Sequence, residues 1–348
     1  MIPIIDISTK EGKKRLDAVM SRTQLDLPDI MDKVNTIISN VKKDGDKVLL
    51  GYAKEFDGAS ISDLKVSAAE IEIAKKSINS DLLDVIKKAA FRIRDFHERQ
   101  KTQSWFNSSK DGEFLGQILR PLNIAGIYVP GGKAAYPSSL LMNIIPAQVA
   151  GVERIIISTP TQKDGTVNPV VLAAAAELGV SEIYKTGGAG AVAAMTFGTE
   201  TIPRVDKIVG PGNIYVALAK KSVYGYVDID SVAGPSEILI IADKTANPAF
   251  VAADMLSQAE HDELAAAICV VTDADMSKEI AAEVEKQTAN LNRQDIIKKS
   301  LDNYGAIIVV KDIDEAIRIS DGIAPEHLEL CCDEPFSQIG RASCRERV

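Results

Sequence analysis

The chain has few of the residues that mark disulfide-rich and thiolate-metal proteins. Its 348 residues include four cysteines, and neither a CxxC pair nor any other metal-type cysteine spacing is present. The cysteines are Cys269, Cys331, Cys332 and Cys344. This usage argues against a disulfide framework and against a thiolate zinc site. It is typical of a reduced compartment, and we expect a cytoplasmic protein.

Acidic residues outnumber basic ones, 49 to 40, and long apolar runs are absent. The net charge is −9 and the pI is about 5.1, so no broad basic face is available for nucleic acid. No apolar run reaches the length of a membrane span, and the first residues lack a basic region followed by an apolar signal core. We therefore expect neither a nucleic-acid partner nor a membrane partner. The remaining composition, 46% hydrophobic and 26% charged, is ordinary for a globular protein of one or two domains.

The first third of the chain carries mainly helical patterns. Residues 1–22 read as a short strand and a charged connector, which together form an N-terminal arm. Apolar residues recur at three- and four-residue steps over 28–56, and residues 81–103 predict a long amphipathic helix. His97 lies among charged residues of that helix, so we interpret it as a surface residue rather than a ligand.

Strands and helices alternate over the rest of the chain. The strands are expected at residues 124–129, 154–158, 182–186, 207–209, 238–242, 265–271 and 305–310. The helices are expected at residues 138–150, 169–178, 191–197, 214–223, 248–260, 277–287 and 312–320. Such alternation predicts an α/β fold of two lobes with parallel-rich, incompletely Rossmann-like sheets, which bind ligands at the carboxyl ends of strands.

The same pattern suggests a domain division. We expect residues 23–127 and 235–340 to form the main α/β domain, with the helical third packed on it. Residues 128–234 are then an inserted lobe. Residues 341–348 have no apolar period and resemble a translated cloning or assembly scar, so we expect a non-native tail.

Three glycine-rich turns follow predicted strands of the inserted lobe. They are Pro130-Gly131-Gly132, Gly187-Gly188-Ala189-Gly190 and Gly210-Pro211-Gly212-Asn213. Glycine lets the backbone approach a phosphate, and a following helix N-terminus favours an anion. The turns indicate a nucleotide or another phosphate-bearing ligand, although glycines also serve simple tight turns.

Two of the three histidines stand beside groups that suit chemistry. Gln258 and His261 are three residues apart, hence on one helix face if the helix continues through them, and both are possible zinc ligands. The alternative is a helix end capped by His261. Glu326-His327 pairs a carboxylate with an imidazole suited to proton transfer, or it is a solvated loop. The Ser236 hydroxyl either holds a polar substrate or caps a turn.

Five motifs in one order make the chain resemble the histidinol dehydrogenase family. The resemblance covers roughly residues 1–338. The motifs are Tyr128-Val-Pro-Gly-Gly, Gly210-Pro-Gly-Asn213, Gly234-Pro-Ser236-Glu237, Ser257-Gln258-Ala-Glu-His261-Asp262 and Ala324-Pro-Glu326-His327-Leu-Glu. The resemblance implies oxidation of L-histidinol to L-histidine through L-histidinaldehyde, the last step of histidine biosynthesis, with two NAD per turnover and one zinc.

The resemblance also implies roles for the residues that carry chemistry. His327 takes protons from the alcohol and later from the hydrated aldehyde, and Glu326 activates the water that adds to the aldehyde. Gln258 and His261 are two zinc ligands. With Ser236 and His327 they form the substrate-binding set, and zinc serves to position the substrate.

For the cofactor, the resemblance assigns Tyr128 and Asn213 as NAD contacts in an intertwined homodimer. Gly190 stands where the family has a glutamine that also contacts NAD, so we expect weakened cofactor affinity and stronger binding on restoring glutamine. The family's further zinc ligands, an aspartate and a partner-subunit histidine, and a substrate-binding glutamate fall beyond the point where this chain stops. We expect the chain as given to bind zinc weakly and to be impaired.

Two other function classes compete with this reading. One is a non-catalytic two-lobe binding protein, which needs no Glu-His pair and no Gln/His metal face. The other is an aldehyde dehydrogenase, which requires a nucleophilic cysteine. Cys269 falls in a predicted buried strand, and Cys331-Cys332 lack a basic neighbour, so neither is expected to be activated.

Overall fold

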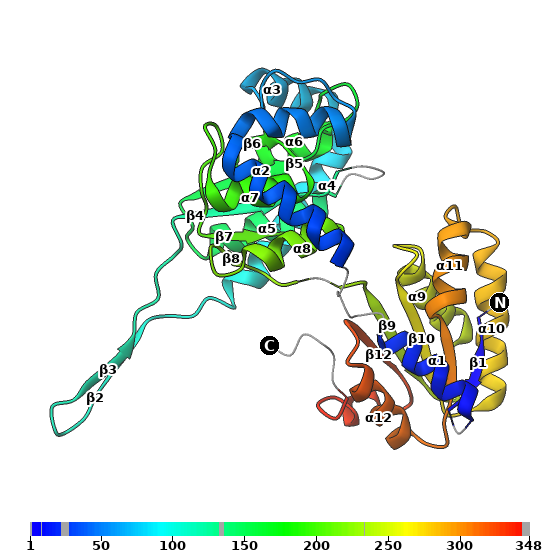
Figure 1. The fold of residues 1–348 in the computed structure, drawn as a ribbon. Helices are drawn as coiled ribbons and strands as arrows, with labels where there is room; N and C mark the ends of the chain where they lie inside the picture. The colour runs from blue at the N-terminus through cyan, green and yellow to red at the C-terminus, as the bar shows by residue number, and fades with distance from the viewer. Residues whose placement is uncertain (1, 8, 22–27, 132–135, 233, 343–348) are drawn as a thin grey trace. The chain divides into compact units, whose positions relative to one another are not determined.

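The structure, a computed structural model, describes residues 2–7, 9–21, 28–131, 136–232 and 234–342 (Figure 1). The chain divides into two compact units. Unit 1 comprises Met1–Asp26 with Gly234–Val348, and unit 2 comprises Leu27–Ala233. Each unit has its own five-stranded parallel sheet. The predicted α/β class with two parallel-sheet lobes is therefore confirmed.

The sheet of unit 2 has the strand order β6-β5-β4-β7-β8. Its strands are β4 Ile124–Tyr128, β5 Arg154–Thr159, β6 Ile183–Lys185, β7 Lys207–Val209 and β8 Asp228–Ile229. The helices that follow them are α5 Pro137–Val149, α6 Pro169–Glu177, α7 Gly188–Phe197 and α8 Ile214–Val223. Helix α7 begins three residues earlier than predicted, so its first turn is built from the glycine run itself.

The helical third packs on this unit, not on the domain that was predicted. It consists of α2 Pro28–Tyr52, a π-helical turn Ala53–Asp57, α3 Ala68–Ser77 and α4 Ser80–Glu98. Helix α2 lies against α7 and α8, α3 against α6, and α4 against α5. The assignment of residues 23–127 to the main domain is therefore wrong. Sequence periodicity shows that a helix has an apolar face, but not which of two apolar surfaces will cover it.

The segment between α4 and β4 forms an antiparallel hairpin of β2 Trp105–Ser108 and β3 Phe114–Gln117. Every residue from 98 to 123 is exposed, including the rings of Trp105, Phe106 and Phe114. The buried apolar run that marks the parallel strands is missing here, because neither face of the hairpin belongs to a core.

Unit 1 is a sheet with the strand order β1-β11-β10-β9-β12. Its strands are β1 Ile4–Asp6, β9 Glu237–Ala242, β10 Ala266–Val271, β11 Ala306–Val309 and β12 His327–Cys331. Its helices are α1 Lys10–Ser21, α9 Pro248–Ala259, α10 Ala274–Thr288, α11 Gln294–Tyr304 and α12 Ile313–Ile323, with a 3-10 turn at Pro335–Ser337. The sequence patterns missed α1, α11 and β12. The N-terminal strand pairs with β11, a partner about 300 residues away in the chain.

The two faces of the unit 1 sheet are covered by different helices (Figure 1). One face packs on Val251 and Met255 of α9, together with residues of α10 and α11. The other packs on Ala316 and Ile317 of α12 and on Leu16 of α1. Sheet residues alternate between these two cores, as the pleat requires. Side chains of β12 therefore divide into an α9-facing set and an α12-facing set.

Candidate functional site

The carboxyl edge of the unit 2 sheet gathers the predicted cofactor contacts. Tyr128 ends β4, Gly188 begins α7 after β6, and Asn213 caps α8 after β7. The Gly188 N–H donates to the Tyr128 hydroxyl at 3.1 Å, and burial raises the pKa of Tyr128, so the phenol stays neutral. Gly187 caps α7 without a side-chain hydrogen bond, which leaves first-turn N–H groups suited to an anion.

Gly210 is held in a conformation that only glycine adopts readily. Its φ is +119°, and a Cβ built there would lie 2.1 Å from the carbonyl oxygen of Tyr128. The Gly210 N–H donates to Asp230 at 2.8 Å, and the buried Lys220 ammonium donates to the Gly210 carbonyl oxygen at 3.1 Å while pairing with Asp230. This glycine therefore brings the β7–α8 turn against the end of β4.

The remaining candidates lie in unit 1, at the edge of its sheet where the strands begin. Ser236 immediately precedes β9, and His327 is the first residue of β12, paired in register with Ile238. Helix α9 connects the parallel strands β9 and β10 and runs antiparallel to them. Gln258 near its end and His261 in the turn that follows therefore lie toward the amino ends of the strands. The sequence pattern predicts ligand binding at the carboxyl ends of strands, whereas these candidates lie at the amino ends.

The Glu326-His327 pair is presented by a strained turn. Ala324 is the only described non-glycine residue with positive φ, at +48°, and it ends α12 directly before Pro325. The Glu326 N–H donates to the buried carboxylate of Glu237 at 3.2 Å. The His327 Nε2 lies 3.8 Å from Glu326 Oε1, and the His327 side chain is 57% exposed. A free imidazole beside a carboxylate is thus open to a substrate.

Gln258 and His261 supply part of a zinc donor set. Gln258 is 6% exposed near the end of α9, and the His261 N–H donates to its carbonyl oxygen at 3.1 Å in the turn that follows. Zinc takes about four ligands, or three with one open position. Across the described ranges no group of three or more His, Cys, Asp or Glu side chains is placed to hold a metal ion. Gln258 and His261 are suitable zinc ligands, but the two of them do not complete the coordination of a zinc ion.

Comparison with known proteins identifies the family. The profile of the histidinol dehydrogenase family matches residues 20–344. A histidinol dehydrogenase from Halalkalibacterium halodurans is 51% identical over 327 residues, covering 93% of this chain and 77% of the relative. The chain belongs to the histidinol dehydrogenase family. One from Geobacillus kaustophilus is 54% identical over 305 residues, covering 88% and 72% of the two chains. The crystal structure of histidinol dehydrogenase from Elizabethkingia anophelis superposes with a TM-score of 0.92 at 38% identity, covering 99% of this chain and 78% of that one.

Family membership decides between the competing function classes. A non-catalytic two-lobe binding protein is not favoured for a chain of this dehydrogenase family. The cysteine nucleophile of an aldehyde dehydrogenase also finds no support among the described cysteines. Cys269 is fully buried with its pKa raised by desolvation, and burial with nearby Glu329 raises the pKa of Cys331 to about 11.

Gly190, at which the sequence resemblance implies a lost NAD contact, is buried inside the first turns of α7. A Cβ built there would lie 3.2 Å from Leu49 Cδ2 and 3.5 Å from Tyr52 Cδ2, both on α2. A side chain at this position therefore begins against α2, and Leu49 must shift slightly to make room for its Cβ. A glutamine at this position can strengthen NAD binding only if moving Leu49 costs little free energy.

We expect the Gly190→Gln variant to lose about 1–3 kcal/mol of unfolding free energy, because it overpacks the α2–α7 contact. Denaturant titration measures this loss. The Gly190→Gln/Leu49→Ala double variant, in which the obstructing side chain is shortened, should lose less than the two single changes together. If the two effects simply add, residue 190 does not face Leu49.

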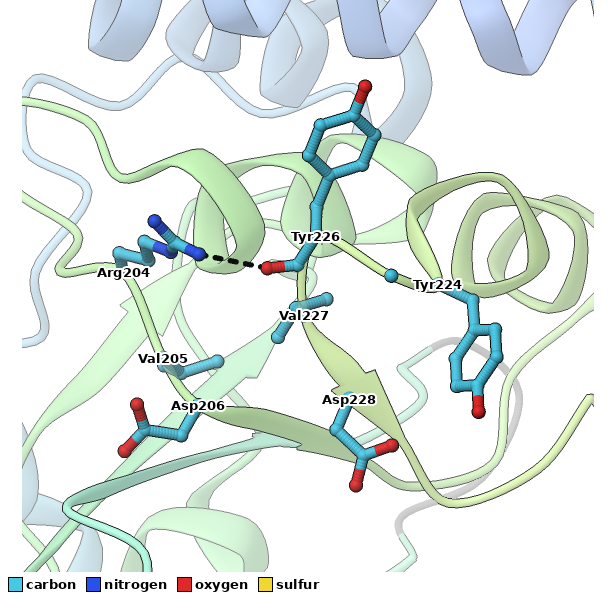
Figure 2. A pocket seen from close by; sticks show the side chains of 8 residues that line it. Arg204, Val205, Asp206, Tyr224, Tyr226, Val227 and Asp228 are labelled. Carbon is cyan, nitrogen blue, oxygen red and sulfur yellow. Dashed lines mark hydrogen bonds between the residues drawn. The ribbon is translucent and has the colours of Figure 1, made fainter.

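One described hollow of unit 2 is at neither candidate edge. It has a volume of about 650 Å³ and lies where the chain enters β7 and β8, between Arg204–Asp206 and Tyr224–Asp228. Figure 2 shows Arg204 donating to the Tyr226 carbonyl oxygen, at 2.9 Å, with the two tyrosine rings pointing in different directions. This is the amino edge of the unit 2 sheet, opposite Tyr128 and Asn213, so it is not the predicted cofactor site.

Sequence reasoning assigned no role to three acidic residues of unit 1. Glu237 accepts the Glu326 N–H, and burial, followed by the Asp254 carboxylate of α9, raises the pKa of Glu329 of β12 to about 7. A period-two pattern was present in His327-Leu-Glu-Leu-Cys331, where polar and apolar residues alternate. Reading it as a strand would have placed His327 and Glu329 on one face.

Proposed function

We propose that this chain is an NAD-dependent histidinol dehydrogenase that oxidises L-histidinol to L-histidine through L-histidinaldehyde, the last step of histidine biosynthesis. The observation that carries the proposal is a family match over most of the chain in which the Glu-His pair lies at the same sheet edge as Gln258 and His261. Both oxidation steps need a proton acceptor, and the second also needs an activated water.

In this proposal His327 accepts the proton in each oxidation. Its ring is exposed at the start of β12, with the Glu326 carboxylate 3.8 Å away. Glu326 activates the water that adds to the aldehyde. The Glu326 N–H donates to Glu237, which fixes the backbone of Glu326, and the Glu326 side chain remains partly exposed.

Tyr128 and Asn213, with the glycine turn at Gly190, form the proposed NAD-binding edge. The neutral phenol of Tyr128 is a hydrogen-bond donor, and the uncapped start of α7 favours a pyrophosphate. Because Asn213 already accepts from the N–H groups of Tyr215 and Val216, its amide NH₂ is the part left to donate to a ligand.

Gln258 and His261 are proposed to hold zinc, and Ser236 to contact the substrate beside them. Bound zinc would hold the substrate's amine and imidazole in place, which is catalysis by positioning. The proposed partners are L-histidinol and a second copy of the chain in a homodimer, and the proposed location is the cytoplasm. Among the described helices, none is both long and apolar enough to cross a membrane.

The test of the proposal is NADH formation from L-histidinol by the purified chain supplied with zinc. Two NADH per histidinol, with histidine as the product, supports it. Absorbance at the NADH band and chromatography of the product give the two measurements. Binding of histidinol or NAD with no turnover, at any zinc concentration, would contradict the proposal for this chain.

We expect the Glu326→Gln variant to damage the aldehyde-to-acid step more than the alcohol-to-aldehyde step. Only the second oxidation requires a water to add to carbon, and an amide cannot accept the water's proton. Loss of a general base costs about 10²–10⁴-fold in rate. Single-turnover assays begun from histidinol and from histidinaldehyde separate the two steps. Equal losses in both would remove this role from Glu326.

A further inference from the structure

A partly buried carboxylate of the helical third lies at the proposed NAD-binding edge of unit 2. Asp57 is the last residue of the π-helical turn that follows α2. The N–H and the hydroxyl of Thr161 both donate to Asp57 Oδ2, at 3.4 and 3.5 Å. Thr161 stands two residues after the end of β5. Asp57 is therefore bound to the loop at the carboxyl end of that strand.

The loop after β5 lies between the turns of the two neighbouring strands. In the sheet, β5 pairs with β4 on one side and with β6 on the other. A Cβ built on Gly131, after β4, would collide with the Pro160 ring, and one built on Gly187, after β6, would lie 2.6 Å from Pro160 Cβ. The two glycine turns thus close on this loop from both sides. Because Asp57 binds the residue after Pro160, its carboxylate lies in the middle of the edge.

The packing of α2 brings Asp57 to this position. Leu49 and Tyr52, near the end of α2, face the first turns of α7 at Gly190. The π-helical turn that follows ends at Gly58, which adopts a left-handed conformation with φ +71°. π-helical turns are rare in proteins and often occur at functional sites. The contact between α2 and α7 therefore fixes the carboxylate beside the start of α7.

The strand order indicates what a carboxylate at this point can bind. In chain order β4 is the first strand of the unit 2 sheet, and the sheet order reads third, second, first, fourth, fifth. Dinucleotide-binding sheets have this order, and an acidic residue at the end of their second strand accepts the ribose 2′-hydroxyl of NAD. The second strand here is β5, and its end, Ser158-Thr159-Pro160-Thr161, has no acidic residue. Asp57 supplies a carboxylate at this place from outside the sheet.

The chemistry of the carboxylate agrees with the strand order. An ionised carboxylate only accepts hydrogen bonds and repels a phosphate, so Asp57 does not suit the pyrophosphate that the start of α7 favours. The ribose hydroxyls of the same ligand are donors. Oδ2 already accepts from Thr161, and among the described residues no donor is bound to Oδ1. Oδ1 can therefore accept a hydroxyl of the ligand.

We propose that Asp57 accepts the 2′-hydroxyl of the adenosine ribose and so makes this chain select NAD over NADP. The inference rests on the proposed NAD-dependent function and deepens it by naming a residue that determines cofactor specificity. NADP carries a phosphate on this oxygen. The phosphate removes the donor and places a second negative group beside the carboxylate, so the same residue favours one cofactor and rejects the other.

The test is calorimetric titration of the purified chain with NAD, with NADP and with an NAD analogue built on 2′-deoxyadenosine. No substrate is added, so the measurement needs no turnover. Asp57→Ala removes the acceptor, whereas Asp57→Asn removes the charge and keeps an acceptor oxygen. Glu55→Gln is the matched control, because Glu55 is an exposed carboxylate of the same π-helical turn. Denaturant unfolding of every variant checks that it folds.

We expect the parent to bind NAD about 10- to 10²-fold more tightly than the deoxy analogue, the range for a hydrogen bond to a charged group. It should bind NADP more weakly still. Asp57→Ala should bind NAD and the deoxy analogue equally and lose most of the discrimination against NADP. Asp57→Asn should keep part of the preference for NAD over the deoxy analogue, but it should also lose most of the discrimination against NADP. Glu55→Gln should keep the parent's ratios.

Equal weakening of all three dinucleotides in Asp57→Ala would show that Asp57 only holds the loop after β5, and it would overturn the proposal. Asp57→Asn is closer in shape to the parent and serves if the alanine variant does not fold. An unchanged ratio of NAD to NADP affinity in that variant would also overturn the proposal.

The proposed function is tested separately, by NADH formation from L-histidinol. A parent that binds NAD but forms no NADH contradicts the proposed function and leaves the assignment of Asp57 to the titrations. Asp57 variants that keep the parent's affinity ratios contradict that assignment alone. A parent that binds none of the three dinucleotides contradicts both.

Discussion

The His327→Ala variant is expected to oxidise L-histidinol about 10²–10⁴-fold more slowly than the parent, the range found on removing a general base. The exposed imidazole at the start of β12 is the group assigned to take the proton, and Glu326 beside it is assigned to the water. Zinc content should be unchanged, because His327 is not part of the Gln258 and His261 donor pair. Steady-state NADH formation and metal analysis of the same preparation measure both.

The control is His97→Ala. His97 lies in the last turn of α4 in unit 2, where its Nδ1 contacts Gln100 at 2.7 Å. It is assigned no chemical role, so its loss should leave turnover within a factor of about two, because changes away from such roles cost little stability or rate. A His327→Ala variant that kept more than half of the parent's activity would refute the role of His327.

The Gly210→Ala variant is expected to lose about 3 kcal/mol or more of unfolding free energy, together with NAD binding. Two costs combine, each of about 1–3 kcal/mol: an alanine at φ +119° is strained, and its Cβ would collide with the Tyr128 carbonyl oxygen. The backbone cannot simply move away, because Asp230 and Lys220 bind both polar groups of Gly210. Denaturant unfolding and calorimetric titration with NAD measure the two losses.

Gly179→Ala is the matched control for backbone strain without collision. Gly179 has φ +74°, and a Cβ built there meets nothing within 4 Å. We expect a loss of only about 1–2 kcal/mol, the cost of a left-handed conformation for an L-residue, and unchanged NAD binding. Equal losses for the two variants would show that the contact with Tyr128 does not restrict residue 210.

The local sequence pattern alone predicts most of the strands of the two sheets and the helices between them. The strand at 207–209 and the helix at 214–223 coincide with β7 and α8, because a buried parallel strand and its crossover helix each carry their own periodicity. Helix α1 was read as a connector, since its apolar residues are few. It is held instead by Arg15, which donates to the carbonyl oxygens of Leu301, Asp302 and Gly305. Such contacts have no local signature.

By itself, the sequence determined the α/β class, the glycine turns, the Glu-His and Gln/His candidates and the resemblance to the dehydrogenase family, because each depends on residues near one another in the chain. Only the tertiary structure decided that α2–α4 cover unit 2, that Gly190 faces Leu49, and that the unit 1 candidates meet at the amino ends of strands. These features depend on which apolar face packs on which core, and that is determined by packing between segments distant in the chain.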